Sequence, residues 1–124
     1  MGFDKQKAED SKKCLQSADL KNSQLQEADL SEGILIEACL DESDLSEADL
    51  CGADLSGATL KNAKLHRTVL YRCRAKEADF SNAILTQANL VEANLSATNF
   101  SHANLKESNI EGANLTHACL QDAN

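Results

Sequence analysis

The chain has no proline and no tryptophan, and its 124 residues include only one tyrosine and three phenylalanines. An ordinary globular core of this size uses more aromatic and β-branched residues, so the scarcity argues against one. No apolar run approaches the roughly 18 residues of a membrane-spanning helix. No charged-then-apolar leader opens the chain, so we expect no signal peptide. The formal net charge of −8 argues against a nucleic-acid binder that works by neutralising phosphates.

Leucine and alanine supply most of the apolar content, and they recur with a strict period of five residues. Every position whose number is a multiple of five, from Leu15 to Leu120, is apolar, which makes 22 positions, 18 of them leucine. A small residue stands two positions earlier in every unit except the one with Lys13, and Asp or Asn usually stands between the two. The sequence is therefore a tandem repeat that reads A-(D/N)-L-x-x. The four exceptions to leucine are Ala75, Phe80, Phe100 and Ile110.

A period of five fits neither ordinary secondary structure. In an α-helix five residues advance about 140° beyond a full turn, so the leucines would spread around the helix. In a flat strand five residues invert the face, so half of the leucines would point to water. The period is satisfied if the chain turns one corner every five residues, always in the same direction. The leucine and the small residue then point inward, and the coils stack at roughly 4.8 Å as a solenoid.

The tandem unit over residues 14–124 resembles the pentapeptide-repeat family. The resemblance implies an all-β fold, a right-handed quadrilateral β-helix with four pentapeptides per coil, so that the 22 units make about 5.5 coils. We divide the chain into an N-terminal arm or short capping segment, residues 1–13, and the repeat β-helix, residues 14–124. Residues 1–13 form either a short helix or a frayed arm, in which Phe3 is a candidate plug for the first coil.

The charges agree with a coil of twenty residues. Residues 14–60 carry a net charge of −10 and residues 61–76 carry +6, so an acidic coil lies below a basic belt. Opposite charges on adjacent strands stabilise by a few tenths of a kcal/mol per pair. The belt also holds the weakest repeats, around Ala75, and we expect local distortion there. The pairs expected from a spacing of twenty are Lys61 with Asp41, Lys64 with Asp44, Arg67 with Glu47, Arg74 with Asp54, and Arg72 with Glu92, with Gly52 below Arg72.

Residues with reactive side chains do not form a recognisable site. No two cysteines form a C-x-x-C pair, and Cys39 and Cys119 share a column four coils apart, too far for a disulfide. We expect free thiols in a reducing cytoplasm, with Cys51 in an outward position. The three histidines fall in different columns, which makes a shared metal site improbable. No glycine-rich phosphate loop occurs. We therefore expect no catalytic activity, no cofactor and no metal.

The Asp or Asn before each leucine has two interpretations. Its side chain can bond nearby backbone at a turn, which a corner every five residues requires. Alternatively, the row of such residues is an acidic rail that resembles a nucleic-acid backbone. The structural interpretation is the stronger of the two.

Two sets of residues are candidates for binding. One is the column Cys51, Tyr71 and Val91, which follows the inward leucine where most units carry Ser, Lys, Thr or Gln. Tyr and Arg are common interface anchors; the alternative is an apolar strip stabilised by stacking alone. The last coil, which the sequence leaves uncapped, is a candidate for end-on self-association. The first set includes the neighbouring Arg67, Arg72 and Arg74, and the second set is Leu105, Ile110, Leu115 and Leu120.

We therefore expect a non-enzymatic rigid rod that serves as a protein-interaction or scaffold module. We expect a protein partner, with end-to-end homo-oligomers as a candidate assembly, and we expect no contact with membrane and no direct binding of nucleic acid. The alternative is a DNA mimic that binds and protects or inhibits DNA gyrase or topoisomerase, as the family resemblance permits. Those relatives are longer, richer in phenylalanine and dimeric. A third possibility is a block excised from a longer repeat. The family is abundant in cyanobacteria, mostly with unassigned roles.

Overall fold

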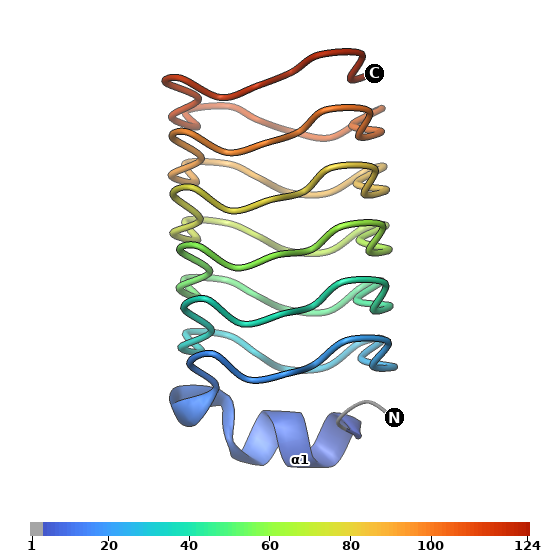
Figure 1. Cartoon of the computed structure of the whole chain (residues 1–124), viewed down its shortest axis with the longest axis vertical. Coiled ribbons are helices and arrows are strands. Elements are labelled where there is room, and N and C mark those ends of the chain that lie inside the picture. The colour runs from blue at the N-terminus through green and yellow to red at the C-terminus, as the bar shows by residue number, and fades with distance from the viewer. Residues whose placement is uncertain (1–3) are drawn as a thin grey trace.

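The computed structural model describes residues 4–124, which form a stack of closed coils standing on a short helix (Figure 1). Helix α1 spans Lys5–Asp10 and the 3-10 turn η1 spans Lys12–Cys14; no other helix occurs in residues 4–124. The N-terminal segment lies at the base of the stack and the C-terminus lies at the opposite end. Phe3 lies outside the described residues, so its role as a plug stays a prediction.

Backbone pairing joins each coil to the next. Parallel β-bridges run in a series from Asp19–Cys39 to Asn99–Cys119, and each joins residues twenty positions apart. The Leu20 N–H donates to the Cys39 carbonyl at 2.7 Å, and the Cys39 N–H donates to the Ala18 carbonyl at 2.9 Å. Each side of a coil is so short that it contributes a single bridged residue. Positions twenty apart therefore lie one above the other, and one coil holds four five-residue units.

A tight turn closes every unit. The Ala28 N–H donates to the Leu25 carbonyl at 3.1 Å, and Glu27, the third residue of the turn, has a φ of 61°. A positive φ at the third position together with this bond is typical of a type II turn. Every corner from Ser17 to Asp122 has such a left-handed residue, and only three of these residues are glycine. The non-glycine residues tolerate this conformation because the coils on either side fix the backbone.

The Asp or Asn of the repeat stabilises the turn that follows it. Asp54 Oδ1 accepts the Ser56 N–H at 3.0 Å, and Asn89 Oδ1 accepts the Val91 N–H at 3.0 Å. These bonds confirm the structural interpretation of this repeat position. The same bond is made by Asp19, Asp29, Asp44, Asp49, Asp79, Asn94, Asn99, Asn104, Asn109 and Asn114.

Leucine ladders and small residues fill the interior. The inward leucines from Leu15 to Leu95 are at most 1% exposed, and burial of each contributes about 1.5–3 kcal/mol. Phe80 and Phe100 stack one coil apart, with ring centroids 5.0 Å apart and planes 11° apart. The expected distortion around Ala75 is wrong, because the bridges continue through this coil and the Ala75 N–H donates to the Asn94 carbonyl at 2.9 Å.

The described part of residues 1–13 caps the base of the stack. Asp4 is the N-cap of α1 and accepts the Lys7 N–H at 2.8 Å. Glu9 Oε2 accepts the Asp29 N–H at 2.7 Å, a donor that would otherwise need a carbonyl from a coil below. The Lys12 carbonyl accepts the Ile34 N–H at 2.7 Å in the same way. Of the two predictions for this segment, a short helix or a frayed arm, the structure shows the short helix.

The charge pairs expected from a spacing of twenty form in part. Three of the five expected pairs are ion pairs at 2.7–3.9 Å. Lys61 differs from these three, because its ammonium lies 3.9 Å from Asp79 Oδ2 and not beside Asp41. Asp41 instead accepts the backbone N–H of Lys61. Surface pairs of this kind stabilise little, so they support the stacking without causing it. The three pairs are Arg67–Glu47, Arg72–Glu92 and Arg74–Asp54.

Candidate partner-binding surface

The predicted column of Cys51, Tyr71 and Val91 lies at one corner of the rod. The three residues occupy equivalent turn positions in successive coils, and each is half-buried. The Gly52 N–H donates to the Tyr71 carbonyl at 2.9 Å, and the Arg72 N–H donates to the Val91 carbonyl at 3.0 Å. The structure therefore brings this column together as a continuous strip, which we call the Tyr71 corner.

Two of the three predicted arginines border the Tyr71 corner. The Arg72 guanidinium carbon lies 5.3 Å from the centroid of the Tyr71 ring, and its Nε donates to Glu92 Oε1 at 2.7 Å. The bond to Glu92 raises the pKa of Arg72 above its ordinary value. Arg74 follows on the adjoining side of the coil. Arg67 belongs to the preceding turn, and its Nε lies 3.9 Å from Glu47 Oε2.

Arg74 contacts the coil below it. Its Nε lies 3.4 Å from Asp54 Oδ2. Burial acts to raise the pKa of Asp54, but hydrogen bonds from the Ser56 hydroxyl and N–H, together with Arg74, outweigh burial and hold this pKa below its ordinary value. Asp54 is therefore a carboxylate that keeps the Arg74 guanidinium against the side of the rod.

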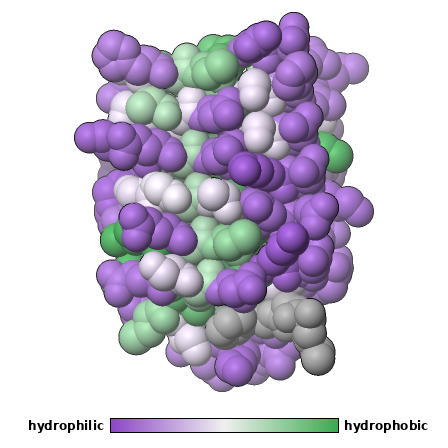
Figure 2. Space-filling model, in the orientation of Figure 1, coloured by the Kyte–Doolittle hydropathy of each residue, from purple (hydrophilic) through white to green (hydrophobic). Residues whose placement is uncertain are grey.

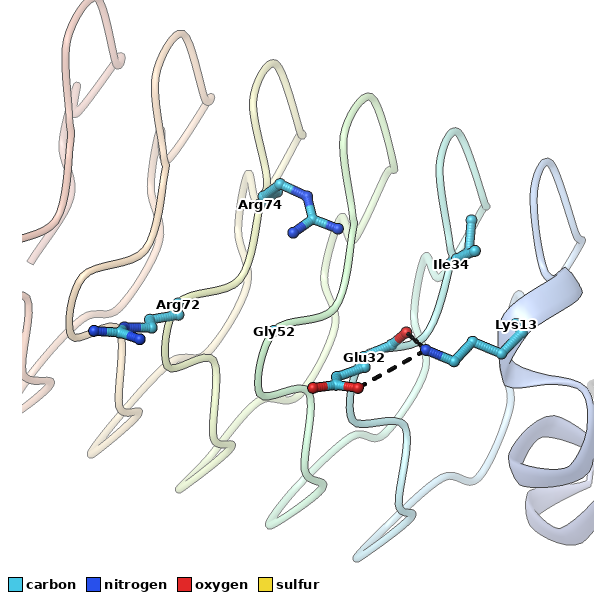
Figure 3. A pocket seen from close by; sticks show the side chains of 6 residues that line it. All are labelled: Lys13, Glu32, Ile34, Gly52, Arg72 and Arg74. Atoms are coloured by element: carbon cyan, nitrogen blue, oxygen red, sulfur yellow. Dashed lines mark hydrogen bonds and ion pairs between the residues drawn. The ribbon is translucent and has the colours of Figure 1, made fainter.

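A hollow of about 470 Å³ lies beside the Tyr71 corner (Figure 3). Figure 3 shows Lys13 and Glu32 at one end, Arg72 at the other, and Gly52 between them. The hollow is not among the surfaces predicted from the sequence. The signal for it in the sequence is Gly52, which interrupts the column between Glu32 and Arg72. The residues that line it are Lys13, Glu32, Ile34, Gly52, Arg72 and Arg74.

Lys13 is the one residue that fails the small-residue rule, and the structure gives the reason. It belongs to η1, not to a coil, and its ammonium donates to the Glu32 carbonyl at 2.7 Å. The same ammonium lies 4.0 Å from Glu32 Oε1. The N-terminal cap therefore supplies one cation to the hollow.

The side chains at the end of the rod differ in exposure. Ile110 and Leu120 are 45% and 47% exposed, while Leu105 and Leu115 are partly buried and pack against the core.

Figure 2 shows that hydrophilic residues predominate on one face of the rod, with a narrower band of less polar residues along it.

Of the cysteines and histidines, only Cys51 is among the residues of the Tyr71 corner and the hollow. All five cysteines are free thiols, and burial raises the pKa of Cys73 to about 12. His66 Nδ1 lies 2.7 Å from Thr86 Oγ1, and His102 Nδ1 lies 3.8 Å from Asp122 Oδ2. In residues 4–124 no group of three or more His, Cys, Asp or Glu is placed to hold a metal ion. Nor does any helix in that range have the length and apolar character to cross a membrane.

Comparison with known proteins identifies similar chains. The family model for pentapeptide repeats matches residues 14–50, 48–87 and 88–124, in 8 copies. Alr5209, a pentapeptide repeat protein from Nostoc Pcc 7120, is 30% identical over 74% of this chain and 84% of that chain, with a TM-score of 0.66. QnrB1, a plasmid-mediated fluoroquinolone resistance protein, is 18% identical over 86% of this chain and 67% of that chain, with a TM-score of 0.49. A search among curated proteins gives no match.

Proposed function

Since the chain belongs to the pentapeptide-repeat family, we propose that it is a non-enzymatic rigid rod that serves as a protein-interaction or scaffold module. We take its coils to be right-handed and quadrilateral, as the family resemblance implies, with an N-terminal cap over residues 1–13 and the repeat β-helix over residues 14–124. The observation that supports the interaction role is the Tyr71 corner, where a half-buried strip adjoins two arginines.

The residue types at this corner suit a protein interface. Tyr and Arg are enriched among residues that dominate binding energy, because both offer a large contact area and a polar group. Arg72 lies against Tyr71, and its bond to Glu92 limits its motion. Less side-chain entropy is then lost when a partner binds. The leucine ladders give the corner a stiff support, since interiors packed in this way deform little.

Capture of a partner from the native host tests the proposal. The bait is the wild-type chain, compared with the double variant Tyr71→Ala/Arg72→Ala, and bound proteins are identified by mass spectrometry. The matched control is Ser81→Ala/Asn82→Ala, at the same turn positions two turns later in the same coil. Arg72 and Asn82 both have a positive φ, so the two variants carry similar backbone strain. We expect the first variant alone to lose the partner. Equal capture by all three chains would refute the proposed corner.

The last coil is a candidate surface for end-on self-association. The observation in its favour is the exposure of Ile110 and Leu120, at 45% and 47%. Sedimentation equilibrium of the wild-type chain and of Ile110→Glu/Leu120→Glu provides the test. A concentration-dependent dimer that the variant abolishes is expected; a wild-type monomer at all concentrations would refute this surface.

Action on DNA gyrase or topoisomerase is the alternative, and it is less well supported. The likeness to QnrB1 concerns the fold alone. The twelve turn-capping Asp and Asn residues include six uncharged asparagines, and the basic belt interrupts the acidic surface. A supercoiling assay with neither inhibition nor protection at micromolar protein would remove this alternative. A cytoplasmic location stays our prediction, supported by the five free thiols.

A further inference from the structure

We propose that the hollow beside the Tyr71 corner binds an extended acidic segment of a partner protein. This inference rests on the proposed function and names the chemistry of the partner. The segment would lie along the rod over Gly52, with its carboxylates on Arg72, Arg74 and Lys13.

The hollow lies over a glycine whose neighbour in the coil above reaches away from it. Gly52 has no side chain, and Glu32 lies below it in the column while Arg72 lies above it. The Glu32 side chain extends toward Gly52, where its Cγ would lie 3.4 Å from an added Cβ, and its carboxylate lies 4.0 Å from the Lys13 ammonium (Figure 3). Arg72 reaches the other way, to Glu92 in the coil above, at 2.7 Å. Gly52 therefore leaves space above the Glu32 side chain, and the Arg72 side chain is held out of that space by Glu92 (Figure 3).

The donors in the hollow favour carboxylates. The lining includes three cations and one carboxylate, in a chain whose net charge is −8. Arg72 and Arg74 bond Glu92 and Asp54 through Nε, and a guanidinium has five N–H donors in a planar fork. Their side chains are 63% and 60% exposed. The remaining donors are therefore available for the bidentate pairing that arginine makes with carboxylates.

The spacing of the cations favours an extended peptide over a single small anion. The Lys13 ammonium bonds the Glu32 carbonyl, and Arg72 belongs to the coil two levels above Glu32. Two coils correspond to roughly 10 Å at the strand spacing, which is about three residues of an extended chain. One carboxylate cannot span this distance, whereas acidic side chains about three residues apart can contact both ends.

A peptide titration followed by nuclear magnetic resonance tests the inference. The protein is labelled with nitrogen-15, and the probe is a terminally blocked hexaglutamate peptide at low ionic strength. Hexaglutamine is the neutral control, and glutarate and inorganic phosphate are the small-anion controls. We expect saturable shifts of the Gly52 amide and of the Arg72 and Arg74 Nε–H signals with hexaglutamate, and far weaker binding of the controls.

The chain offers a matched pair of glycine variants. Gly52 and Gly57 both have a φ of +69°, and an added Cβ would lie 3.4 and 3.3 Å from a glutamate Cγ. Asparagine already occupies this turn position at Asn62 and Asn82, so both glycine-to-asparagine variants should fold. We expect Gly52→Asn, which fills the hollow, to weaken hexaglutamate binding by about tenfold, and Gly57→Asn to leave it unchanged.

The inference would be overturned by the absence of a saturable shift with millimolar hexaglutamate, by shifts of equal size at Lys61 and Lys64, or by equal effects of Gly52→Asn and Gly57→Asn. Glutarate or phosphate binding as strong as hexaglutamate would show a small-anion site and would also overturn it. If Gly52→Asn retains the captured partner while Tyr71→Ala/Arg72→Ala loses it, the corner stands as an interface and only the acidic-segment inference fails.

Discussion

Gly33 allows a sharp test, because the repeat pattern and the structure predict opposite effects of one substitution. It occupies the inward small-residue position, where most units carry alanine. The repeat alone therefore predicts that Gly33→Ala stabilises the chain, by about 0.4–1 kcal/mol, because alanine restricts the unfolded state. The structure predicts a loss, since an added Cβ would crowd the repeat residues Leu30 and Leu35 and the N-terminal cap at Lys12.

The contacts of an added methyl group set the magnitude. A Cβ on Gly33 would lie 2.9 Å from the Leu30 carbonyl oxygen, 3.0 Å from Leu35 Cδ1 and 3.2 Å from the Lys12 carbonyl oxygen. Two of the three neighbours are backbone atoms, which cannot rotate away. Overpacking of this kind costs about 1–3 kcal/mol. After the gain in the unfolded state is subtracted, we expect a net loss of about 1–2 kcal/mol.

Urea and thermal unfolding followed by circular dichroism measure this difference. A loss of this size lowers Tm by roughly 3–8 °C in a chain of this length. Ala53→Gly is the matched control, because Ala53 is buried one coil above Gly33 in the same column. It should also destabilise, by about 0.5–1 kcal/mol. A Gly33→Ala midpoint equal to or above that of the parent chain would refute the predicted overpacking at this position.

Three further predictions concern buried or titrating groups. Ser23→Ala should stabilise the chain by about 1 kcal/mol, because the buried Ser23 Oγ has no hydrogen-bond partner in the described residues. Ser43→Ala is the control and should not stabilise it, since Ser43 Oγ donates to the Leu40 carbonyl at 2.6 Å. Urea unfolding measures both changes. A thiol reagent with mass spectrometry should modify Cys73 only after unfolding, because burial raises its pKa to about 12; native-state labelling would contradict its placement. Hydrogen bonds from the Ser31 hydroxyl and N–H lower the pKa of Asp29 from 3.8 to about 2. The contribution of the Asp29 carboxylate to the free energy of unfolding is therefore complete above pH 3.8 and is lost as the pH falls through about 2. Melting curves of Asp29→Asn should vary less over that range than those of the parent chain, and an identical pH dependence would contradict this assignment.

The sequence predicts the repeating part of the fold well because one physical demand recurs in every unit. A leucine and a small residue must point inward, and a corner must follow, so the pattern is redundant across the chain. The turn-capping role of residues such as Asp54 follows from the same demand. Ala75 departs from the pattern without distorting the coil, because its neighbours in the ladder fix the backbone around it.

The parts that do not repeat were harder to predict. The helical cap depends on single contacts, such as Glu9 with the Asp29 N–H, that no periodicity reveals. The hollow depends on the directions in which Glu32 and Arg72 lean, and a spacing of twenty specifies only which residues are stacked. The sequence placed Gly52 below Arg72 and Glu92 above it. The pair Arg72–Glu92 was therefore predictable, whereas the direction of the Glu32 side chain came only from the structure.

Site-specific photo-crosslinking in the native host tests the central claim, that the Tyr71 corner binds a partner, most directly. A photoreactive phenylalanine analogue replaces Tyr71 in one chain and Ser81 in another. Both sites are half-buried and are the second residues of turns in the same coil. We expect one defined protein adduct from position 71 that is absent from position 81. We also expect the adduct from position 71 to weaken when Gly52 is replaced by asparagine. No adduct at position 71, or the same adduct from both positions, would contradict the claim.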